Sequence, residues 1–204
     1  MTKIITLVGT HCTFKTTFTQ ALHEAASARG LSSCVVSEVA RLCPLPMNKQ
    51  QTKESTMWIF NEQLKQEEKA LKQNTDVLFC DRSFLDPFAY YCASHESFID
   101  EFINGMDICG IRLQALIDVY KQHYDFTLHM RATQNKSLIT EDGFRNTDFK
   151  FRRSVDEVFL NLFTRGGIKK DSAWASKHFM EKRAIRVDYR KEFFDRLLSR
   201  ILAN

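Results

Sequence analysis

A short apolar stretch near the N-terminus leads directly into residues that can hold a phosphate group. Residues 4–8 are apolar, Gly9 follows them, and Lys15, Thr16 and Thr17 begin six residues after that glycine. Backbone N–H groups of such a loop can wrap the β-phosphate of a nucleotide, while the lysine reaches the β- and γ-oxygens and the threonine hydroxyl ligates Mg²⁺. The spacing therefore predicts a strand, an anion-binding loop and a helix, in that order.

One position of this loop departs from the pattern G-x-x-x-x-G-K-[ST]. Phe14 stands in the place of the second glycine. Glycine lets backbone approach a phosphate closely and accepts torsion angles that other residues resist. The alternative interpretation is an ordinary strand-to-helix turn followed by a lysine on the helix. If the loop does bind a nucleotide, its residues are Gly9, Thr10, His11, Cys12, Thr13, Phe14, Lys15, Thr16 and Thr17.

A second group of polar residues follows the next predicted strand, residues 33–36. Glu38 lies just beyond its end, and Arg41 comes three residues later. Ligands of an open parallel sheet bind beyond the carboxyl ends of its strands. Glu38 is therefore a candidate general base for an acceptor hydroxyl, with Arg41 on the same face of a helical turn. The alternative is a surface Glu–Arg pair that contributes little.

The third predicted strand, residues 76–80, ends at Asp81, Arg82 and Ser83. An acidic residue at the tip of a strand beside the phosphate loop can hold the Mg²⁺ shell, and a neighbouring arginine can neutralise phosphate oxygens. The alternative is that Asp81 or Ser83 caps the helix that begins near Phe84. The two roles are compatible with each other.

A polar segment later in the chain carries a cluster of arginines. Arg145, Arg152 and Arg153 accompany a stretch that ends where Thr147 or Asp148 can cap a helix. This composition is typical of a lid that closes over phosphates, and we place the predicted lid at residues 131–153. A solvated, basic helix start is the alternative interpretation.

Periodicity predicts the remaining elements and the fold. These elements are the helices 16–29, 52–72, 98–124 (interrupted around Gly105 and Gly110) and 192–202 and the strands 126–130 and 184–187. The alternation of strands and helices implies a doubly wound α/β fold, a parallel five-stranded sheet with helices on both faces. Trp58 in the second helix can line an acceptor pocket or pack in the core, and His129 is expected to be an interior histidine.

Composition limits the function classes. The chain has 204 residues, 44% of them hydrophobic, and a net charge of +4, which suits one α/β domain over residues 1–204 and a phosphate-rich ligand. Its six cysteines form no C-x-x-C pair and read as reduced core residues of a cytoplasmic protein. No signal peptide or apolar run of about 18 residues is present, so we expect no membrane partner. The dispersed basic residues make nucleic-acid binding the weakest of the partner hypotheses.

Four pieces of the sequence occur together in a known family, in the same order. They are residues 9–17, 37–41, 80–91 and 142–157, and residues 52–60 add a spaced T-x-x-x-T-x-W-I-F pattern. In these pieces the chain resembles P-loop NTPases of the nucleoside and nucleotide kinase group. It is most similar to the small AAA-type ATP-binding domains that include the ribosylnicotinamide kinase domain of bacterial NAD regulators. The resemblance covers about residues 3–165 and leaves the tail from Gly166 without a match.

The resemblance implies an ATP-dependent phosphotransferase that uses ATP and Mg²⁺. It implies that Lys15 contacts the β- and γ-phosphates and that Thr16 and Asp81 hold the metal. Glu38 would bind or deprotonate the acceptor hydroxyl. The implied arginines are Arg41 and Arg82 near the acceptor or the transferred phosphate, and Arg145 with Arg152 or Arg153 in the lid.

Two functions from different classes remain open on the sequence. The first is a kinase for a nucleoside, a nucleotide or a modified pyrimidine, with Trp58 in the acceptor pocket. The second is a nucleotide-binding or regulatory protein that has lost catalysis because Phe14 replaces the loop glycine. The sequence does not reveal the oligomeric state.

Overall fold

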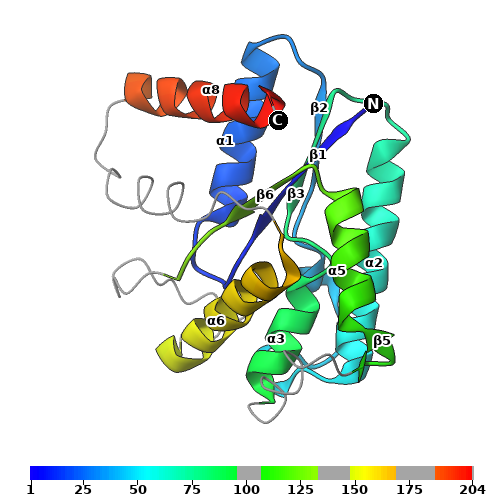
Figure 1. Ribbon diagram of the computed structural model, residues 1–204. Coiled ribbons are helices and arrows are strands. Elements are labelled where there is room, and N and C mark those ends of the chain that lie inside the picture. The colour runs from blue at the N-terminus through cyan, green and yellow to red at the C-terminus, as the bar shows by residue number, and fades with distance from the viewer. Residues whose placement is uncertain (96–106, 133–147, 169–186, 204) are drawn as a thin grey trace.

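A parallel β-sheet forms the centre of the structure, a computed structural model that describes residues 1–95, 107–132, 148–168 and 187–203. In these residues the sheet has four strands in the order β2-β3-β1-β6 (Figure 1). The strands are β1 (Lys3–Val8), β2 (Ser33–Val36), β3 (Val77–Asp81) and β6 (Phe126–His129). All adjacent pairs are parallel, so the carboxyl ends of the strands lie at one edge.

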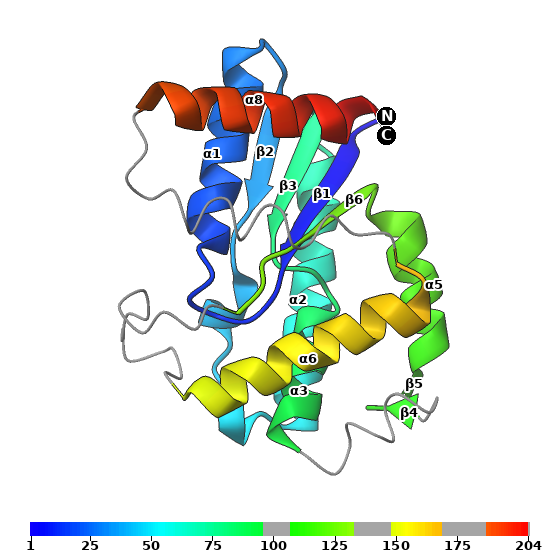
Figure 2. The same ribbon diagram turned by 60° about the vertical axis from the view of Figure 1, so that its left-hand side comes forward.

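The side chains of β1 alternate between two buried faces. Ile4 and Val8 belong to one hydrophobic cluster, whereas Ile5 and Leu7 belong to the other. This two-residue alternation is a property of extended backbone, and a strand that is apolar on both sides needs helices on both faces. The sheet accordingly is covered on each side (Figures 1 and 2).

Helices α1 (Lys15–Ala28) and α8 (Val187–Ala203) cover one face of the sheet, and α2 (Lys53–Leu71), α3 (Asp86–Ser94), α5 (Leu113–His123) and α6 (Phe149–Gly166) cover the other. Helix α8 packs across α1, where the rings of Phe18 and Phe194 lie 4.8 Å apart in an edge-on contact. The two ends of the chain lie side by side, since Lys3 Nζ donates a 2.7 Å hydrogen bond to the Leu202 carbonyl (Figure 2).

Two 3₁₀ helices, η1 (Val39–Leu42) and η2 (Asn48–Gln50), follow β2 and lead into α2. Thr52 caps α2 with a reciprocal pair of hydrogen bonds to Ser55, which explains why this long helix begins where it does. Helices α2 and α6 begin within a residue or two of the predicted positions.

The interruption predicted around Gly110 in the helix over residues 98–124 is present, and it is a hairpin between residues 107 and 112, while residues 98–106 lie outside the described residues. Strands β4 (Asp107–Ile108) and β5 (Ile111–Arg112) form a small antiparallel hairpin there, and α5 starts only at Leu113. The turn residues Cys109 and Gly110 have φ of 54° and 82°, which a helix cannot contain but a two-residue hairpin loop requires.

The fifth predicted strand is not part of the described sheet. Residues 184–186 lie outside the described residues, and Val187, predicted as the last residue of that strand, begins α8. None of the helices in the described ranges has the length and apolar character needed to cross a membrane. All six cysteines are described and none forms a disulfide.

Candidate active site

The loop between β1 and α1 starts at a glycine that no other residue could replace without movement. Gly9 has φ of +130°, and a Cβ atom built on it would lie 2.4 Å from the backbone oxygen of Met130. Because that neighbour is backbone, it cannot rotate away as a side chain could. The loop therefore begins in close contact with the segment that follows β6.

Phe14 adopts the conformation that the second glycine of the pattern would be expected to take. It is the N-cap residue of α1, with φ 63° and ψ 22°, in the left-handed region. For a residue with a Cβ this costs about 1–2 kcal/mol. Phe14 supplies no side-chain cap to α1. Since the first N–H groups of a helix lack partners within the helix, an anion at this end is a suitable partner for them.

The ammonium group of Lys15 is buried inside this loop. Its Nζ atom donates to the Thr10 carbonyl at 2.6 Å and to Thr13 Oγ1 at 3.2 Å. Burial, followed by the positive charge of Arg82, lowers the pKa of Lys15 to about 7, although nearby carboxylates oppose that shift. A negatively charged ligand beside Nζ would restore its charged form, so the electrostatics of the loop favour an anion.

Thr16 and Asp81 meet across the carboxyl edge of the sheet. Thr16 Oγ1 donates a 2.5 Å hydrogen bond to Asp81 Oδ2. The other carboxylate oxygen, Oδ1, is buried and has no hydrogen-bond partner among the described residues. Mg²⁺ prefers hard oxygen ligands of this kind, so the Thr16 hydroxyl and the Asp81 carboxylate, with its one unsatisfied oxygen, fit this metal.

The capping role that the sequence left open for Asp81 and Ser83 differs from what forms. Helix α3 begins at Asp86, and its N-cap residue Leu85 provides no side-chain hydrogen bond. Ser83 Oγ instead accepts from the Leu85 N–H at 3.2 Å and donates to Asp86 Oδ2 at 2.8 Å. Asp81 is held by Thr16 and so remains beside the phosphate loop.

Glu38 joins two arginines at the end of β2. Its Oε1 atom accepts from Arg82 Nε at 2.6 Å, and its Oε2 atom accepts from Arg41 Nε at 3.0 Å. Burial alone would raise the pKa of Glu38, but the charges of Arg82, Lys15 and Arg41 outweigh it and lower the pKa to about 2. Glu38 is therefore ionised at neutral pH.

Arg82 links the phosphate loop to α3. Its Nη1 atom donates to the Gly9 carbonyl at 3.2 Å and to Asp86 Oδ1 at 3.1 Å. The guanidinium carbon lies 5.3 Å from the centre of the Tyr90 ring, within cation–π range. Arg82 has φ of 98°, so the backbone is held in an uncommon conformation at this junction.

A cavity of about 510 Å³, counted with its open mouth, is lined by Arg82 and Glu38. That volume is in the range of small-molecule sites. Its polar lining consists of His11, Glu38, Asn48, Gln51, Gln63, Arg82, Ser83, Asp86 and Tyr90. Of the predicted acceptor residues, Glu38 and Arg82 line this cavity. Arg41 reaches it only through Glu38, and Trp58 is partly buried against the hydrophobic core, outside the lining.

The arginines of the predicted lid separate into two roles. Arg152 is fully buried and donates to the loop carbonyls of His11 at 3.3 Å and Cys12 at 3.5 Å, while its Nη1 atom is buried with no partner in the described part of the chain. Arg153 points away and pairs with Glu157 in solvent. Arg145 lies outside the described residues.

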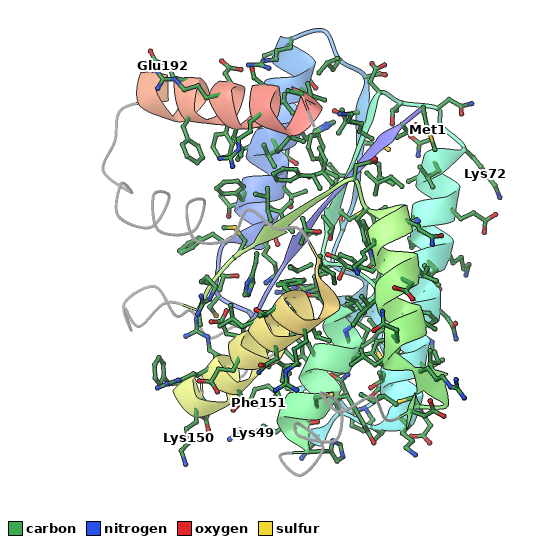
Figure 3. The ribbon with its side chains drawn as sticks, viewed as in Figure 1. Met1, Lys49, Lys72, Lys150, Phe151 and Glu192 are labelled. Atoms are coloured by element: carbon green, nitrogen blue, oxygen red, sulfur yellow. The ribbon has the colours of Figure 1, made fainter. Side chains whose placement is uncertain are left out.

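Helix α6 therefore brings Arg152 onto the phosphate loop from the far side of the sequence. Residues 149–153, assigned to the predicted lid, form its first turns, and Asp148 caps it by accepting from the Phe151 N–H at 3.2 Å. Lys49, next to the cavity residue Asn48, pairs with Asp148 at 2.5 Å, so the start of α6 is tied to the loop before α2 (Figure 3).

His129 also matches its expected interior role. It is fully buried, and its Nε2 atom lies 3.0 Å from Asp156 Oδ1 on α6. Asp156 is held in turn by Arg131 at 2.8 Å. This contact joins the end of β6 to α6, next to Gly9 at the start of the phosphate loop.

Several cavity residues were not predicted. Asp86 and Tyr90 follow Arg82 at intervals of four residues, so a helical reading of residues 82–90 would have placed all three on one face. Gln51 and Gln63 carry no comparable sequence signal, because an isolated glutamine near a helix start or on a helix is usually exposed.

Comparison with known proteins agrees with the fold. A family model described as an AAA domain matches residues 4–178. No curated protein matches the sequence. Two solved structures of deoxyadenosine kinase from M. mycoides share the fold. The structure with the products dCMP and a flexible dCDP is 13% identical, with a TM-score of 0.59, and the match covers 96% of this chain and 98% of that one. The structure with bound dATP is 16% identical, with a TM-score of 0.56, and the match covers 97% and 99%.

The two levels of similarity support different statements. The matched structures share little sequence, so they establish the α/β fold of a P-loop kinase and nothing about substrate. The family model covers most of the chain, including the loop, Glu38, Asp81 and α6. By that match the chain belongs to the AAA domain family, and its structure is that of a P-loop nucleoside or nucleotide kinase-like protein.

Proposed function

We propose that this protein is a Mg²⁺- and ATP-dependent kinase that transfers the γ-phosphoryl group to a nucleoside, a nucleotide or a modified pyrimidine in the cytoplasm. One arrangement carries the proposal. Arg82 lies between a phosphate loop that buries the Lys15 ammonium and a cavity that contains the Glu38 carboxylate. A phosphoryl donor on one side and a hydroxyl acceptor on the other would meet at this guanidinium.

The residues on the loop side suit a triphosphate. Lys15 and the buried Nη1 of Arg152 provide positive charge, and the start of α1 provides N–H groups. Thr16 and Asp81 would hold Mg²⁺. Bound Mg²⁺–ATP would supply the transferable phosphoryl group and neutralise part of its charge. Catalysis of this kind depends on positioning and charge stabilisation more than on a nucleophilic side chain.

The residues on the cavity side suit an acceptor hydroxyl. Glu38 is ionised, so it can accept a hydrogen bond from that hydroxyl and hold it toward the loop. With a pKa of about 2, it is a weak base in the free protein. We therefore assign Glu38 chiefly to orientation of the hydroxyl, with Arg82 neutralising the charge on the transferred group.

A phosphoryl-transfer screen tests the proposal. ATP would be offered with nucleosides, nucleoside monophosphates, nicotinamide riboside and hydroxymethylpyrimidine nucleotides, with Lys15→Ala as the matched variant. We expect one acceptor class to be phosphorylated by wild type and none by Lys15→Ala, because a methyl group cannot replace the ammonium. Equal turnover by the two proteins would refute the kinase function.

A second function has one observation in its favour, the strained Phe14 at the place of the glycine. On that hypothesis the protein is a regulatory module with impaired catalysis. Titration of Mg²⁺–ATP into wild type and Phe14→Gly separates the two. If only the glycine variant binds, the natural protein is not an ordinary ATP-dependent enzyme.

A further inference from the structure

The turn after β3, residues Arg82–Phe84, has a backbone conformation that needs support from its surroundings. Arg82 has φ of 98°, and a torsion angle of this kind persists only where the surrounding structure over-determines it. The turn is buried, so its backbone polar groups also need partners. The Arg82 N–H donates to the Leu7 carbonyl of β1 at 3.0 Å, and the Ser83 N–H donates to Asp86 Oδ2 at 2.8 Å.

Two further groups of the turn are held by side chains from other elements. Gln63 of α2 donates from Nε2 to the Arg82 carbonyl at 3.2 Å. The Phe84 N–H donates to the hydroxyl oxygen of Tyr124, just after α5, at 3.2 Å. Burial raises the pKa of Tyr124, so the phenol keeps its proton and donates it in turn.

Both of these side chains meet at one atom, Oε1 of Glu67 on α2. Gln63 Nε2 donates to it at 2.6 Å, and the Tyr124 hydroxyl donates to it at 2.7 Å. Glu67 is fully buried, and its other oxygen lies 2.5 Å from His123 Nε2. A carboxyl oxygen without a proton accepts both bonds whether or not the other oxygen carries one. The arrangement therefore does not depend on the charge of Glu67.

We infer that Glu67 is a positioning residue for phosphoryl transfer and that it acts on Arg82 through Gln63 and Tyr124. The inference rests on the proposed function, in which Arg82 neutralises charge on the transferred group. Removal of the Oε1 acceptor would release two supports of a strained turn at once. The Arg82 backbone, and with it the guanidinium, would then lose its fixed place.

This role should separate the chemical step from ATP binding. Lys15 and Arg152, which we assign to the triphosphate, lie on α1 and α6. Among the described residues, their hydrogen bonds go to the phosphate loop and none goes to Glu67 or its partners. A displaced guanidinium beside the transferred group is felt in the transition state, so kcat should fall while the Kd for Mg²⁺–ATP stays the same.

Three substitutions test the inference. Glu67→Met removes both carboxyl oxygens at similar volume. Glu67→Gln is the conservative variant, because its amide oxygen can accept both bonds while its NH₂ group donates to a neutral His123 imidazole. Tyr124→Phe keeps Glu67 and removes only the link to the Phe84 N–H.

Two control variants account for effects that do not pass through the turn. Glu68→Met repeats the substitution one residue further along α2, where Glu68 pairs with Lys72 in solvent. Ile201→Ala destabilises the protein at a buried position of α8. Its neighbour Leu202 accepts from Lys3 at the amino end of β1, so Ile201 lies at the opposite edge of the sheet from the candidate site.

Amide hydrogen exchange, followed by NMR on the free protein, measures the turn directly. The rate at the Phe84 N–H is compared with the rates of the β1 amides, which removes any effect of global stability. We expect this ratio to rise by about tenfold or more in Glu67→Met and in Tyr124→Phe. It should stay at the wild-type value in Glu67→Gln and in both controls.

Kinetics use the acceptor that wild type phosphorylates in the screen described above, and calorimetry gives the Kd for Mg²⁺–ATP. Glu67→Met and Tyr124→Phe should each lower kcat by about tenfold or more and keep the Kd within about twofold. Glu67→Gln should stay within about threefold of wild type in kcat, and both controls should match wild type. The double variant of Glu67→Met and Tyr124→Phe should be no slower than Glu67→Met alone, because both changes act on one path.

The outcomes separate this inference from the proposed function. An unchanged exchange ratio in Glu67→Met, or a loosened turn with wild-type kcat, would overturn the inference and leave the kinase function standing. So would an Ile201→Ala protein that is slowed as much as Glu67→Met. If Glu67→Met does not fold, Tyr124→Phe, which loses a single oxygen atom, decides in its place. If wild type phosphorylates no acceptor, the proposed function itself fails, and this role of Glu67 fails with it.

Discussion

Arg82 Nε lies 2.6 Å from Oε1 of Glu38, and the two side chains come from the ends of the neighbouring strands β3 and β2. Their side chains are 9% and 11% exposed, so the pair is largely shielded from water. Removing one partner of such a pair leaves the other charge buried and uncompensated. That destabilises a protein more than replacing both partners would. The pair is therefore a structural support as well as part of the candidate site.

This pair predicts a pH-dependent stability. The folded-state pKa of Glu38 is lowered from 4.5 to about 2, so its contribution is present above pH 4.5 and is lost as the pH falls toward 2. Wild type should be more stable than Glu38→Gln at pH 6 by about 3 kcal/mol, and at pH 3 this difference should shrink by about 2 kcal/mol. Urea denaturation at the two pH values measures it. Glu24→Gln, at an exposed site on α1, should leave the free energy of unfolding unchanged at both pH values. A stability difference between wild type and Glu38→Gln that does not depend on pH would contradict the prediction.

Lys15 predicts a pH-dependent affinity for ATP. Its pKa in the free protein is about 7, and only the charged form binds a phosphate well. Above pH 7 binding must therefore take up a proton, and the affinity should fall by about tenfold per pH unit between pH 8 and pH 10. Calorimetry in two buffers of different ionisation enthalpy would detect the proton uptake. Lys15→Ala should bind weakly with no such slope, and the same slope in both proteins would assign the titration to another group.

Asp81 and Thr16 predict where the metal acts. Asp81→Asn keeps the shape of the side chain but removes its charge, so Mg²⁺ should no longer strengthen ATP binding, and turnover should fall by at least about 100-fold. Affinity for metal-free ATP should stay the same or rise. Thr16→Ser, which retains the hydroxyl, should keep the Mg²⁺ effect. Retention of the full effect in Asp81→Asn would exclude Asp81 from the metal site.

The adjacent arginines of α6 allow a comparison within one helix turn. Arg152→Met should weaken ATP binding by about 30-fold, because a buried guanidinium that contacts the loop and keeps one nitrogen unpartnered among the described residues is lost. Arg153→Met should stay within about twofold of wild type, since Arg153 pairs with Glu157 in solvent. Equal losses in the two variants would mean that the effect is general electrostatic attraction and not a specific contact.

Gly9 predicts a large loss of stability. In Gly9→Ala the new methyl would meet the Met130 oxygen at 2.4 Å, so the loop or the end of β6 must move, at a cost of at least about 3 kcal/mol. Gly30 also has positive φ, +73°, but nothing lies within 4 Å of the position that a Cβ atom would take, so Gly30→Ala should cost about 1 kcal/mol. Thermal denaturation of both variants checks the difference.

The regular part of the fold could be predicted because its physical causes are local. The strands β1, β2, β3 and β6 are short apolar runs, and α1, α2 and α6 show helical periodicity, with side-chain caps at the starts of α2 and α6. The interruption around Gly110 could be predicted, but not its form as the hairpin β4–β5, since that also depends on positive φ at Cys109, a residue without a turn preference. Sequence periodicity also does not distinguish a last strand from the start of α8.

The site could be predicted where function requires a fixed spacing. The loop, Glu38 and Asp81 each follow a strand, so the topology brings them to one edge, where the structure places them. The sequence could not show that Arg152 and not Arg153 contacts the phosphate loop, because that depends on the direction of each side chain on α6. The place of Gln63 in the cavity lining required three-dimensional contacts, because its amide donates to Glu67 on α2 and to the Arg82 carbonyl after β3.

The crossing of α8 over α1 has a consequence for biosynthesis. Phe18, three residues after the loop lysine, has Phe194 as its ring partner, and residues 187–203 leave the ribosome long after α1. Until then one face of α1 and of the sheet is open to solvent (Figure 2). A nascent chain would thus hold every described residue of the candidate nucleotide site and still lack the packing of α8 on α1, so we predict that tight ATP binding arises only after α8 is translated.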